Sequence, residues 1–88
     1  MPVVTLRQPL RDLAGGAAEV EVDATSVGAA LQELERAHPA LEGWIVDERG
    51  RIRPHVNVYV RGERSRPETP VSQDEVLHVL SAISGGAR

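Results

Sequence analysis

The chain of 88 residues contains neither cysteine nor lysine. Without cysteine, disulfide bonds, thiolate metal sites and thiol catalysis are excluded, so any sulfur chemistry must use another atom. Because all ten basic residues are arginine, the N-terminal amine is the only ordinary amine, and lysine-linked self-conjugation is excluded as well. These two absences narrow the covalent chemistry that the side chains can carry out.

Long apolar runs and an excess of positive charge are lacking too. No run approaches the ~20 apolar residues that span a bilayer, and the N-terminus does not resemble a signal peptide, so we expect a cytoplasmic protein without membrane contact. The net charge of −3 gives no reason to expect a nucleic-acid partner, because phosphate binding needs a clustered positive surface. Arg49, Arg51 and Arg53 form one local basic cluster, beside Asp47 and Glu48, and this pattern is typical of a solvated loop.

The composition that remains is that of a globular domain. Hydrophobic residues make up 41% and charged residues 26% of the chain, which is too apolar for a disordered protein. The length allows one compact core. We expect a single domain over residues 1–83 and a C-terminal tail over residues 84–88.

Alternating polar and apolar residues predict four strands, over about residues 2–8, 19–23, 55–61 and 75–82. The first two form a hairpin through a turn at Gly15-Gly16, with Val20 and Val22 facing inward. In the third strand, one face carries only valines: Val56, Val58 and Val60. This strand is the clearest in the chain, and we expect it to lie centrally in the sheet.

One main helix is predicted between the second and third strands. Ser26 is a suitable N-cap, and Pro39 ends the helix near His38. The helix has an apolar stripe of Val27, Ala30, Leu31 and Leu34, and a polar face of Gln32, Glu33, Glu35 and Arg36 that is expected to face water. A short second helical turn is expected to place Leu41, Trp44 and Ile45 over the core.

This order of elements predicts an α+β protein of the β-grasp (ubiquitin-like) fold, with a mixed sheet of four to five strands packed on one main helix. Because the helix stripe and the valine face are the largest apolar surfaces, Leu31 and Val58 should pack together and be almost fully buried. In the last strand, Leu77 and Val79 should point inward, which leaves Val76, Leu80 and Ala82 on the outer face. A bulge near His78 would exchange the two sets.

The chain ends in Gly85-Gly86 followed by Ala87 and Arg88. A diglycine near a terminus can simply be frayed chain. Alternatively, an extended Gly-Gly can thread a narrow channel and bring a carboxylate to the α-phosphate of ATP, because glycine has no side chain to obstruct it. A strand that runs directly into the diglycine fits this second interpretation.

Three stretches of the sequence resemble the family of the bacterial molybdopterin-synthase small subunit and the thiamine sulfur carrier, which are relatives of ubiquitin. The stretches are PLRDLAGGAAEVEVDATSVGAALQEL, VDERGRIRPHVNVYVRGE and DEVLHVLSAISGG. The resemblance covers nearly the whole chain, and the second stretch is most similar to the longer carriers that supply sulfur for cysteine or other metabolites.

The resemblance implies a carrier rather than an enzyme. An adenylating enzyme of the ubiquitin-activating type would use ATP to activate the Gly86 carboxylate, sulfur would replace AMP, and the resulting thiocarboxylate would donate sulfur in an acceptor enzyme. The chain itself would bind no cofactor or metal, and the wide spacing of His38, His55 and His78, without cysteine, also argues against a metal site.

Family members usually end at the second glycine, whereas Ala87 and Arg88 follow it here. Some relatives carry an extension that a JAMM-type metallopeptidase removes, and the resemblance implies the same processing for this chain. The competing hypothesis is a paralogue in which the tail does not act as a carrier.

A docking surface is expected on the sheet, formed by Val76, His78 and Leu80 with Tyr59 from the third strand. For Tyr59 and its neighbour Asn57, simple solvent exposure is an equal alternative. Three other functions stay open: the small subunit of molybdopterin synthase, a ubiquitin-like modifier attached through Gly86 to lysines of other proteins, and a plain binding module without tail chemistry.

Overall fold

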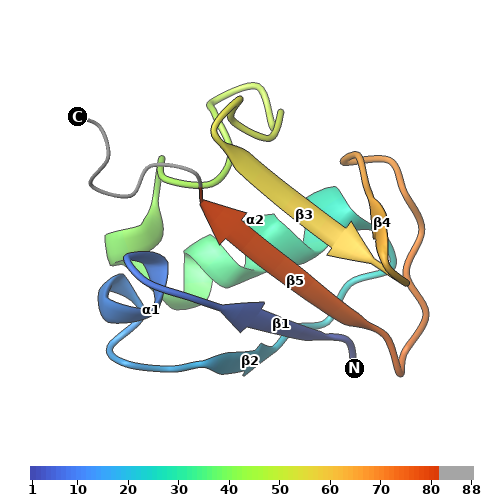
Figure 1. Cartoon of the computed structure of the whole chain (residues 1–88), viewed down its shortest axis with the longest axis horizontal. Helices are drawn as coiled ribbons and strands as arrows, with labels where there is room; N and C mark the ends of the chain where they lie inside the picture. Colours follow the sequence, from blue (N-terminus) through green and yellow to red (C-terminus); the bar gives the residue numbers. More distant parts are fainter. Residues whose placement is uncertain (82–88) are drawn as a thin grey trace.

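Five strands form one mixed sheet in the order β2-β1-β5-β3-β4. The computed structural model describes residues 1–81, so the expected boundary at residue 83 lies outside the described residues. The strands are β1 (Val3–Leu6), β2 (Glu19–Glu21), β3 (Val56–Val60), β4 (Glu63–Arg64) and β5 (Val76–Ser81). β1 and β5 run parallel, and the other neighbours are antiparallel (Figure 1). The predicted α+β architecture is confirmed.

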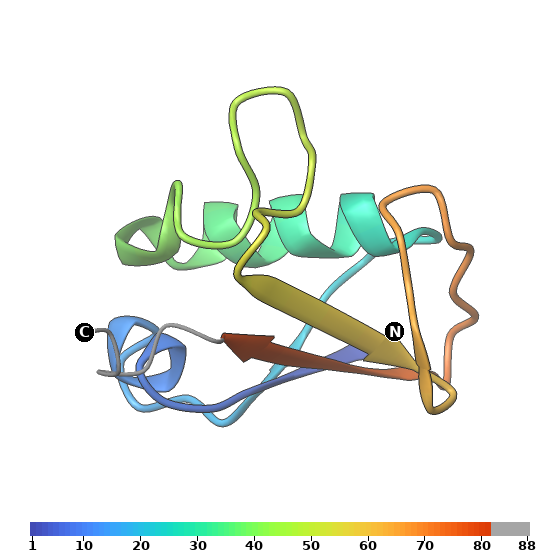
Figure 2. The ribbon, with the colours of Figure 1, turned by 45° about the horizontal axis from the view of Figure 1, so that its top comes forward.

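Helix α2 (Val27–Ala37) covers one face of this sheet and leaves the other face open (Figure 2). The hydroxyl of Ser26 accepts a hydrogen bond from the backbone N–H of Ala29 at 3.2 Å, as expected of an N-cap. His38 is the C-cap, directly before Pro39. Within residues 1–81, no helix is long and apolar enough to cross a membrane.

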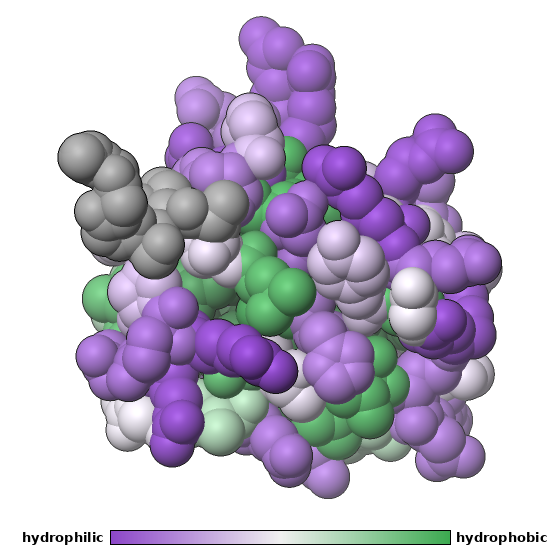
Figure 3. All heavy atoms as spheres, viewed as in Figure 1, coloured by the Kyte–Doolittle hydropathy of each residue, from purple (hydrophilic) through white to green (hydrophobic). Residues whose placement is uncertain are grey.

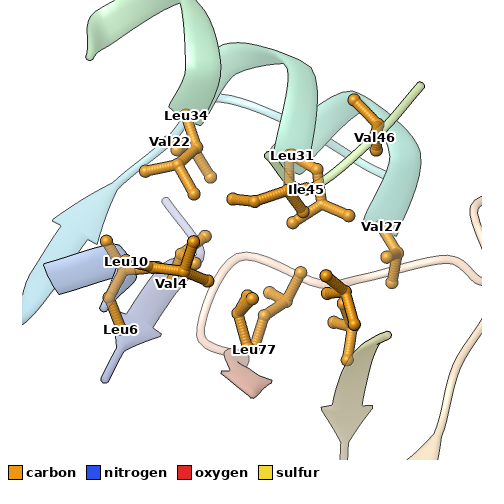
Figure 4. Packing of buried hydrophobic residues seen from close by; sticks show 14 of the residues in the cluster. Val4, Leu6, Leu10, Val22, Val27, Leu31, Leu34, Ile45, Val46 and Leu77 are labelled. Carbon is orange, nitrogen blue, oxygen red and sulfur yellow. The ribbon is translucent and has the colours of Figure 1, made fainter. Parts of the chain in front are cut away.

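The core lies between α2 and the covered face of the sheet (Figure 4). Leu31 of α2 and Val58 of β3 belong to the same buried cluster and have no exposed surface, which confirms the prediction for this pair. The helix stripe is buried throughout, and Leu77 and Val79 of β5 point into the same cluster. The predicted inward faces of the helix and of these two strands are therefore correct.

The prediction that the third strand is central was wrong. β5 occupies the middle of the sheet, and β3 lies between β5 and the edge strand β4. The reason is that β5 joins the two hairpins, since it pairs in parallel with β1 and antiparallel with β3, so that β3 becomes an interior strand beside it. Both pairings join segments far apart in the sequence, so the local pattern of β3 could not show them.

The strands of the first hairpin are shorter than predicted, and the connection between them is longer. β1 ends at Leu6, and a short helix α1 (Leu10–Leu13) with a buried Leu10 precedes the glycine turn. Gly15 and Gly16 follow it at φ +71° and +89°, a conformation that glycine adopts without steric cost. The connection therefore adds a buried side chain to the core as well as reversing the chain.

A second hairpin joins β3 to β4, a strand that was not predicted. Arg61 and Gly62 form its two-residue turn, both at positive φ, as the right-handed twist of paired strands favours. β4 is only two residues long, so it has no alternating pattern to detect in the sequence.

The expected position of Trp44 over the core was wrong. A short 3-10 helix, η1 (Pro39–Leu41), follows α2, and Leu41 and Ile45 are fully buried, whereas Trp44 is 38% exposed. Gly43, at φ +84°, turns the chain between them. The backbone oxygen of Ile45 then accepts a hydrogen bond from the backbone N–H of Arg53 at 2.9 Å, which anchors the segment at the buried Ile45.

The burial of Leu31 predicts a large effect of its truncation. Leu31→Ala should lower the free energy of unfolding by about 3 kcal/mol, because the methyl groups lose their contacts and a cavity is left behind. Urea denaturation measures this loss. The matched control is Gln32→Ala on the exposed side of the same helix, which should change stability by less than about 0.5 kcal/mol. Equal losses in both variants would contradict the placement of the core.

Candidate functional site

The residues expected to carry the chemistry, Gly85 and Gly86, and the extension Ala87-Arg88 lie outside the described residues. The structure does describe the strand that leads to them. β5 ends at Ser81, four positions before Gly85 in the sequence. Its last residue pairs with Val56 of β3, and the pairing with β1 extends as far as Val79. The segment before the tail is therefore built into the centre of the sheet.

Hydrogen bonds to Glu75 hold the start of β5 in place. Glu75 directly precedes the strand, and its carboxylate accepts a hydrogen bond from the guanidinium of Arg61 in the β3–β4 turn and another, at 2.8 Å, from the backbone N–H of Ser72. The hydrogen bond from Arg61 is the largest cause that lowers the pKa of Glu75 below its ordinary value. A carboxylate that stays ionised thus joins β5 to the neighbouring hairpin.

The predicted docking residues share one sheet face, the one turned away from α2. Val76, His78 and Leu80 alternate along β5 with the buried Leu77 and Val79, so no bulge exchanges the two sets. Tyr59 of β3 lies opposite His78 in the register and therefore on the same face. Ala82, expected beside them, lies outside the described residues. We call this surface the outer face.

The apolar surface of the outer face falls into two parts (Figure 3). Val76, which is 39% exposed, lies beside Val3 of β1 at one end, and the half-buried Leu80 lies at the other. His78 separates them, and its Nδ1 is 3.0 Å from the hydroxyl of Thr5. The sequence placed these residues on one face, but it could not show that a polar pair from two strands divides them.

Glu35 was expected to face water, and this was wrong. One of its carboxylate oxygens accepts hydrogen bonds from two consecutive backbone N–H groups, those of Ile45 at 3.2 Å and Val46 at 3.1 Å. An unpaired donor at these buried positions would be costly. Glu35 therefore ties α2 to the segment that follows η1, an interaction across ten residues that helical periodicity does not reveal.

That segment lies at the end of the sheet towards which β5 points (Figure 1). The backbone oxygen of Ile45 accepts a hydrogen bond from the backbone N–H of Arg53. The backbone oxygen of Arg53 in turn accepts a hydrogen bond from the backbone N–H of Val56, and Val56 pairs with Ser81 of β5. The exposed Trp44 directly precedes Ile45, whose backbone N–H is bound by Glu35. Tryptophan is enriched among residues that dominate protein interfaces, so Trp44 joins the candidate docking residues.

Among residues 1–81, no three histidine or carboxylate side chains are arranged to hold a metal ion. The site consists of a strand paired on both sides, an outer face with two apolar parts, and an exposed tryptophan in the segment that follows η1. These features can bind and orient a partner protein.

Comparisons with known proteins agree with this geometry. Residues 4–86 match the model of the ThiS family. The chain is 37% identical over 68 residues to Small archaeal modifier protein 1 of Haloferax volcanii, and the matched region covers 77% of each protein.

Solved structures show the same fold. The crystal structure of SAMP1 from Haloferax volcanii superposes with a TM-score of 0.80 at 32% identity, over 97% of this chain and 98% of that chain. One chain of the BexX/CysO complex of Amycolatopsis orientalis superposes with a TM-score of 0.85 at 27% identity, over 98% of this chain and 100% of that chain. CysO of Mycobacterium tuberculosis, at 23% identity, reaches a TM-score of 0.83 over 93% of this chain and 99% of that chain.

The double hydrogen bond of Glu35 predicts a specific loss of stability. Glu35→Ala should lower the free energy of unfolding by about 2 kcal/mol, because two backbone donors lose their acceptor. Thermal or urea unfolding measures the loss, and Trp44 fluorescence should report a change in its surroundings. Glu33→Ala is the matched control on the same helix, since it removes only an exposed ion pair with Arg36 worth less than about 0.5 kcal/mol. If the two variants are equally stable, Glu35 does not hold the segment.

Proposed function

This chain belongs to the ThiS family, and from that premise we propose that it is a sulfur carrier whose C-terminal Gly86 becomes a thiocarboxylate. The family membership confirms the resemblance found in the sequence, and the relatives are small ubiquitin-like modifiers and sulfur carriers rather than catalytic enzymes. The identity of the reacting group, its activation and its acceptor are the proposal.

The proposed chemistry begins with hydrolysis of the Gly86–Ala87 peptide bond by a peptidase, which frees the Gly86 carboxylate. In an adenylating enzyme, this carboxylate attacks the α-phosphate of ATP, and pyrophosphate leaves. Sulfide then attacks the acyl carbon of the adenylate, and AMP leaves with the electron pair of the broken carbon–oxygen bond. The thiocarboxylate sulfur finally attacks an electrophilic substrate in an acceptor enzyme. The chain contributes positioning and docking to each step.

The observation that carries the proposal is the double pairing of β5. A strand paired on both sides up to Val79, and on one side up to Ser81, gives the following segment a fixed point of departure. Partner enzymes that recognise the folded domain therefore always meet the tail at the same place. No step requires a cysteine or lysine of the chain, which agrees with their absence from the sequence.

The outer face supports docking of such partners. Interfaces combine an apolar centre with polar groups that set the orientation, and the two apolar parts around Val76 and Leu80 with the polar pair of His78 and Thr5 have this composition. Leu80 is the member of the face that is closest in sequence to the tail. We assign it the contact with the adenylating enzyme.

A second function is favoured by a specific observation, the 37% identity to a protein named a modifier. In that role, the activated Gly86 would be transferred to the amine of a lysine on another protein. Both functions share the adenylate, and they differ in the attacking atom, sulfur or nitrogen. Gly86-linked conjugates on lysines of other proteins in cells would show the modifier function.

The docking role of Leu80 can be tested by a charge substitution. Leu80→Glu should leave the fold intact, because the side chain lies on the outer face, but should slow adenylation by at least about tenfold, equivalent to about 1.4 kcal/mol. Pyrophosphate release by the adenylating enzyme measures the rate, with a chain ending at Gly86 as substrate. Gln32→Glu introduces the same charge on the opposite side of the domain and should react at the normal rate. Unchanged kinetics for a folded Leu80→Glu protein would contradict the assignment.

The tail chemistry predicts a difference between two lengths of the chain. A chain ending at Gly86 should be adenylated and converted by sulfide to a thiocarboxylate, whereas the chain ending at Arg88 should remain unmodified because its Gly86 carboxyl is in a peptide bond. Intact mass spectrometry after iodoacetamide treatment reads the product directly, since no cysteine of the chain can be alkylated. Failure of the shorter chain to gain an alkylatable sulfur with any adenylating enzyme of its own genome would favour the plain binding module.

A further inference from the structure

A cleft with a volume of about 560 Å³ runs along the edge of the sheet formed by β3 and β4. Its walls come from residues 51–54, from β3 and from residues 64–68. Figure 2 shows the corresponding segments, the loop before β3 and the segment after β4, on the same side of the domain. Four arginines line it, namely Arg51, Arg53, Arg64 and Arg66. We call it the arginine cleft.

Folding creates this concentration of positive charge. Of the four lining arginines, only Arg51 and Arg53 lie close together in the sequence, in the cluster beside two acids. Arg64 and Arg66 come from a separate segment, in and after β4. Among the lining residues, Glu68 is the one carboxylate, whereas Arg53 also lines a second pocket, with Glu35, Glu42, Asp47 and Glu48. In a chain with a net charge of −3, the cleft is therefore a local exception.

Among residues 1–81, most of this charge forms no close ion pair. In the part of the chain that the structure describes, Arg51, Arg53 and Arg64 form no ion pair within 4.0 Å. Arg66 reaches Glu68 only at 4.0 Å, and with both side chains more than 70% exposed, at 83% and 74%, such a pair contributes little. The exposed guanidinium groups of Arg51, Arg64 and Arg66 are available to an external anion, whereas the Nε of Arg53 is buried.

Asp47, an acid of the same loop, is bound mainly by backbone N–H groups. One of its carboxylate oxygens accepts hydrogen bonds from the backbone N–H groups of Arg49 and Arg51, both at 2.9 Å. The bond from Arg51 is the largest cause that lowers the pKa of Asp47, and the charges of Arg51 and Arg53 lower it further. Asp47 thus holds the turn of the loop with its ionised carboxylate.

The apolar groups of the cleft form its floor. Its accessible apolar side chains are the half-buried Ile52 and Pro67 and the exposed Pro54, which lie over the buried Val56 and Val58. Arg51, Arg64 and Arg66 are exposed around them. An apolar centre with a charged rim is the composition of a protein interface, and arginine is enriched there. A small anion would be better held by buried charged groups, and a nucleic acid would require a longer positive surface than one cleft.

We propose that the arginine cleft binds an acidic segment of a partner protein, with one apolar side chain of that segment on the floor and its carboxylates on the arginine rim. Charge complementarity identifies the chemistry of the partner. Arg64 pairs with Tyr59 across β3 and β4, so the cleft adjoins the outer face, and one partner can contact both surfaces. The proposal does not depend on the tail chemistry.

NMR titration of the ¹⁵N-labelled chain provides the test. The probe is the peptide acetyl-Glu-Asp-Leu-Asp-Glu-amide, compared with the same peptide carrying serine in place of leucine and with ATP. We expect saturable amide shifts within residues 51–58 and 64–68, and weaker binding when NaCl rises from about 0.05 M to about 0.5 M. The serine peptide should bind more weakly. Equal binding of both peptides, tighter binding of ATP, or shifts spread over the domain would each overturn the proposal.

Charge reversal supplies the matched comparison. Arg64→Glu combined with Arg66→Glu should weaken peptide binding by at least about tenfold, because two rim charges become repulsive. Arg7→Glu combined with Arg11→Glu makes the same change of net charge at exposed positions around α1, and it should leave binding unchanged. The amide spectrum of each variant verifies its fold, and Arg51→Glu serves as a second rim variant. Equal losses of peptide binding in the rim and control variants would refute specific binding in the arginine cleft.

Discussion

The pairing of β5 with both β1 and β3 is the contact on which the other features depend. It joins the two hairpins into one sheet and places Leu77 and Val79 in the core beneath α2. Because side chains alternate along a strand, the same pairing sends Val76, His78 and Leu80 to the outer face. A disruption of β5 would therefore affect the core, the docking surface and the attachment of the tail together.

Under the proposed function, the paired strand before the tail explains how the chain would work without catalytic side chains. The proposed reaction needs only a carboxylate, and the specificity has to come from how partner enzymes hold the domain. The outer face offers two apolar parts separated by the pair of His78 and Thr5, and Trp44 adds an exposed aromatic group in the segment that follows η1. A carrier that visits several enzymes benefits from such separate contacts, because each partner can use a different combination.

The arginine cleft adds a surface of different chemistry on the β4 edge. Two of its arginines precede β3 in the sequence and two follow it. The backbone hydrogen bonds that Asp47 accepts hold the loop that supplies Arg51 and Arg53. The domain thus presents the outer face, with its two apolar parts, and the basic arginine cleft, and these two surfaces adjoin along β3 and β4. Partners could be distinguished by whether they contact one of these surfaces or both.

The sequence by itself determined the helix, the inward faces of β3 and β5, the fold class and the family, because periodicity and capping act over a few residues and the matching stretches span nearly the whole chain. It did not determine that β5 is central, that Glu35 binds Ile45 and Val46, that Trp44 is exposed, or that four arginines line one cleft. Each of these features joins segments that are distant in sequence or depends on a turn at a single glycine. Only the packed tertiary structure decides which distant groups meet, since that outcome minimises unpaired backbone donors and exposed apolar surface over the whole domain.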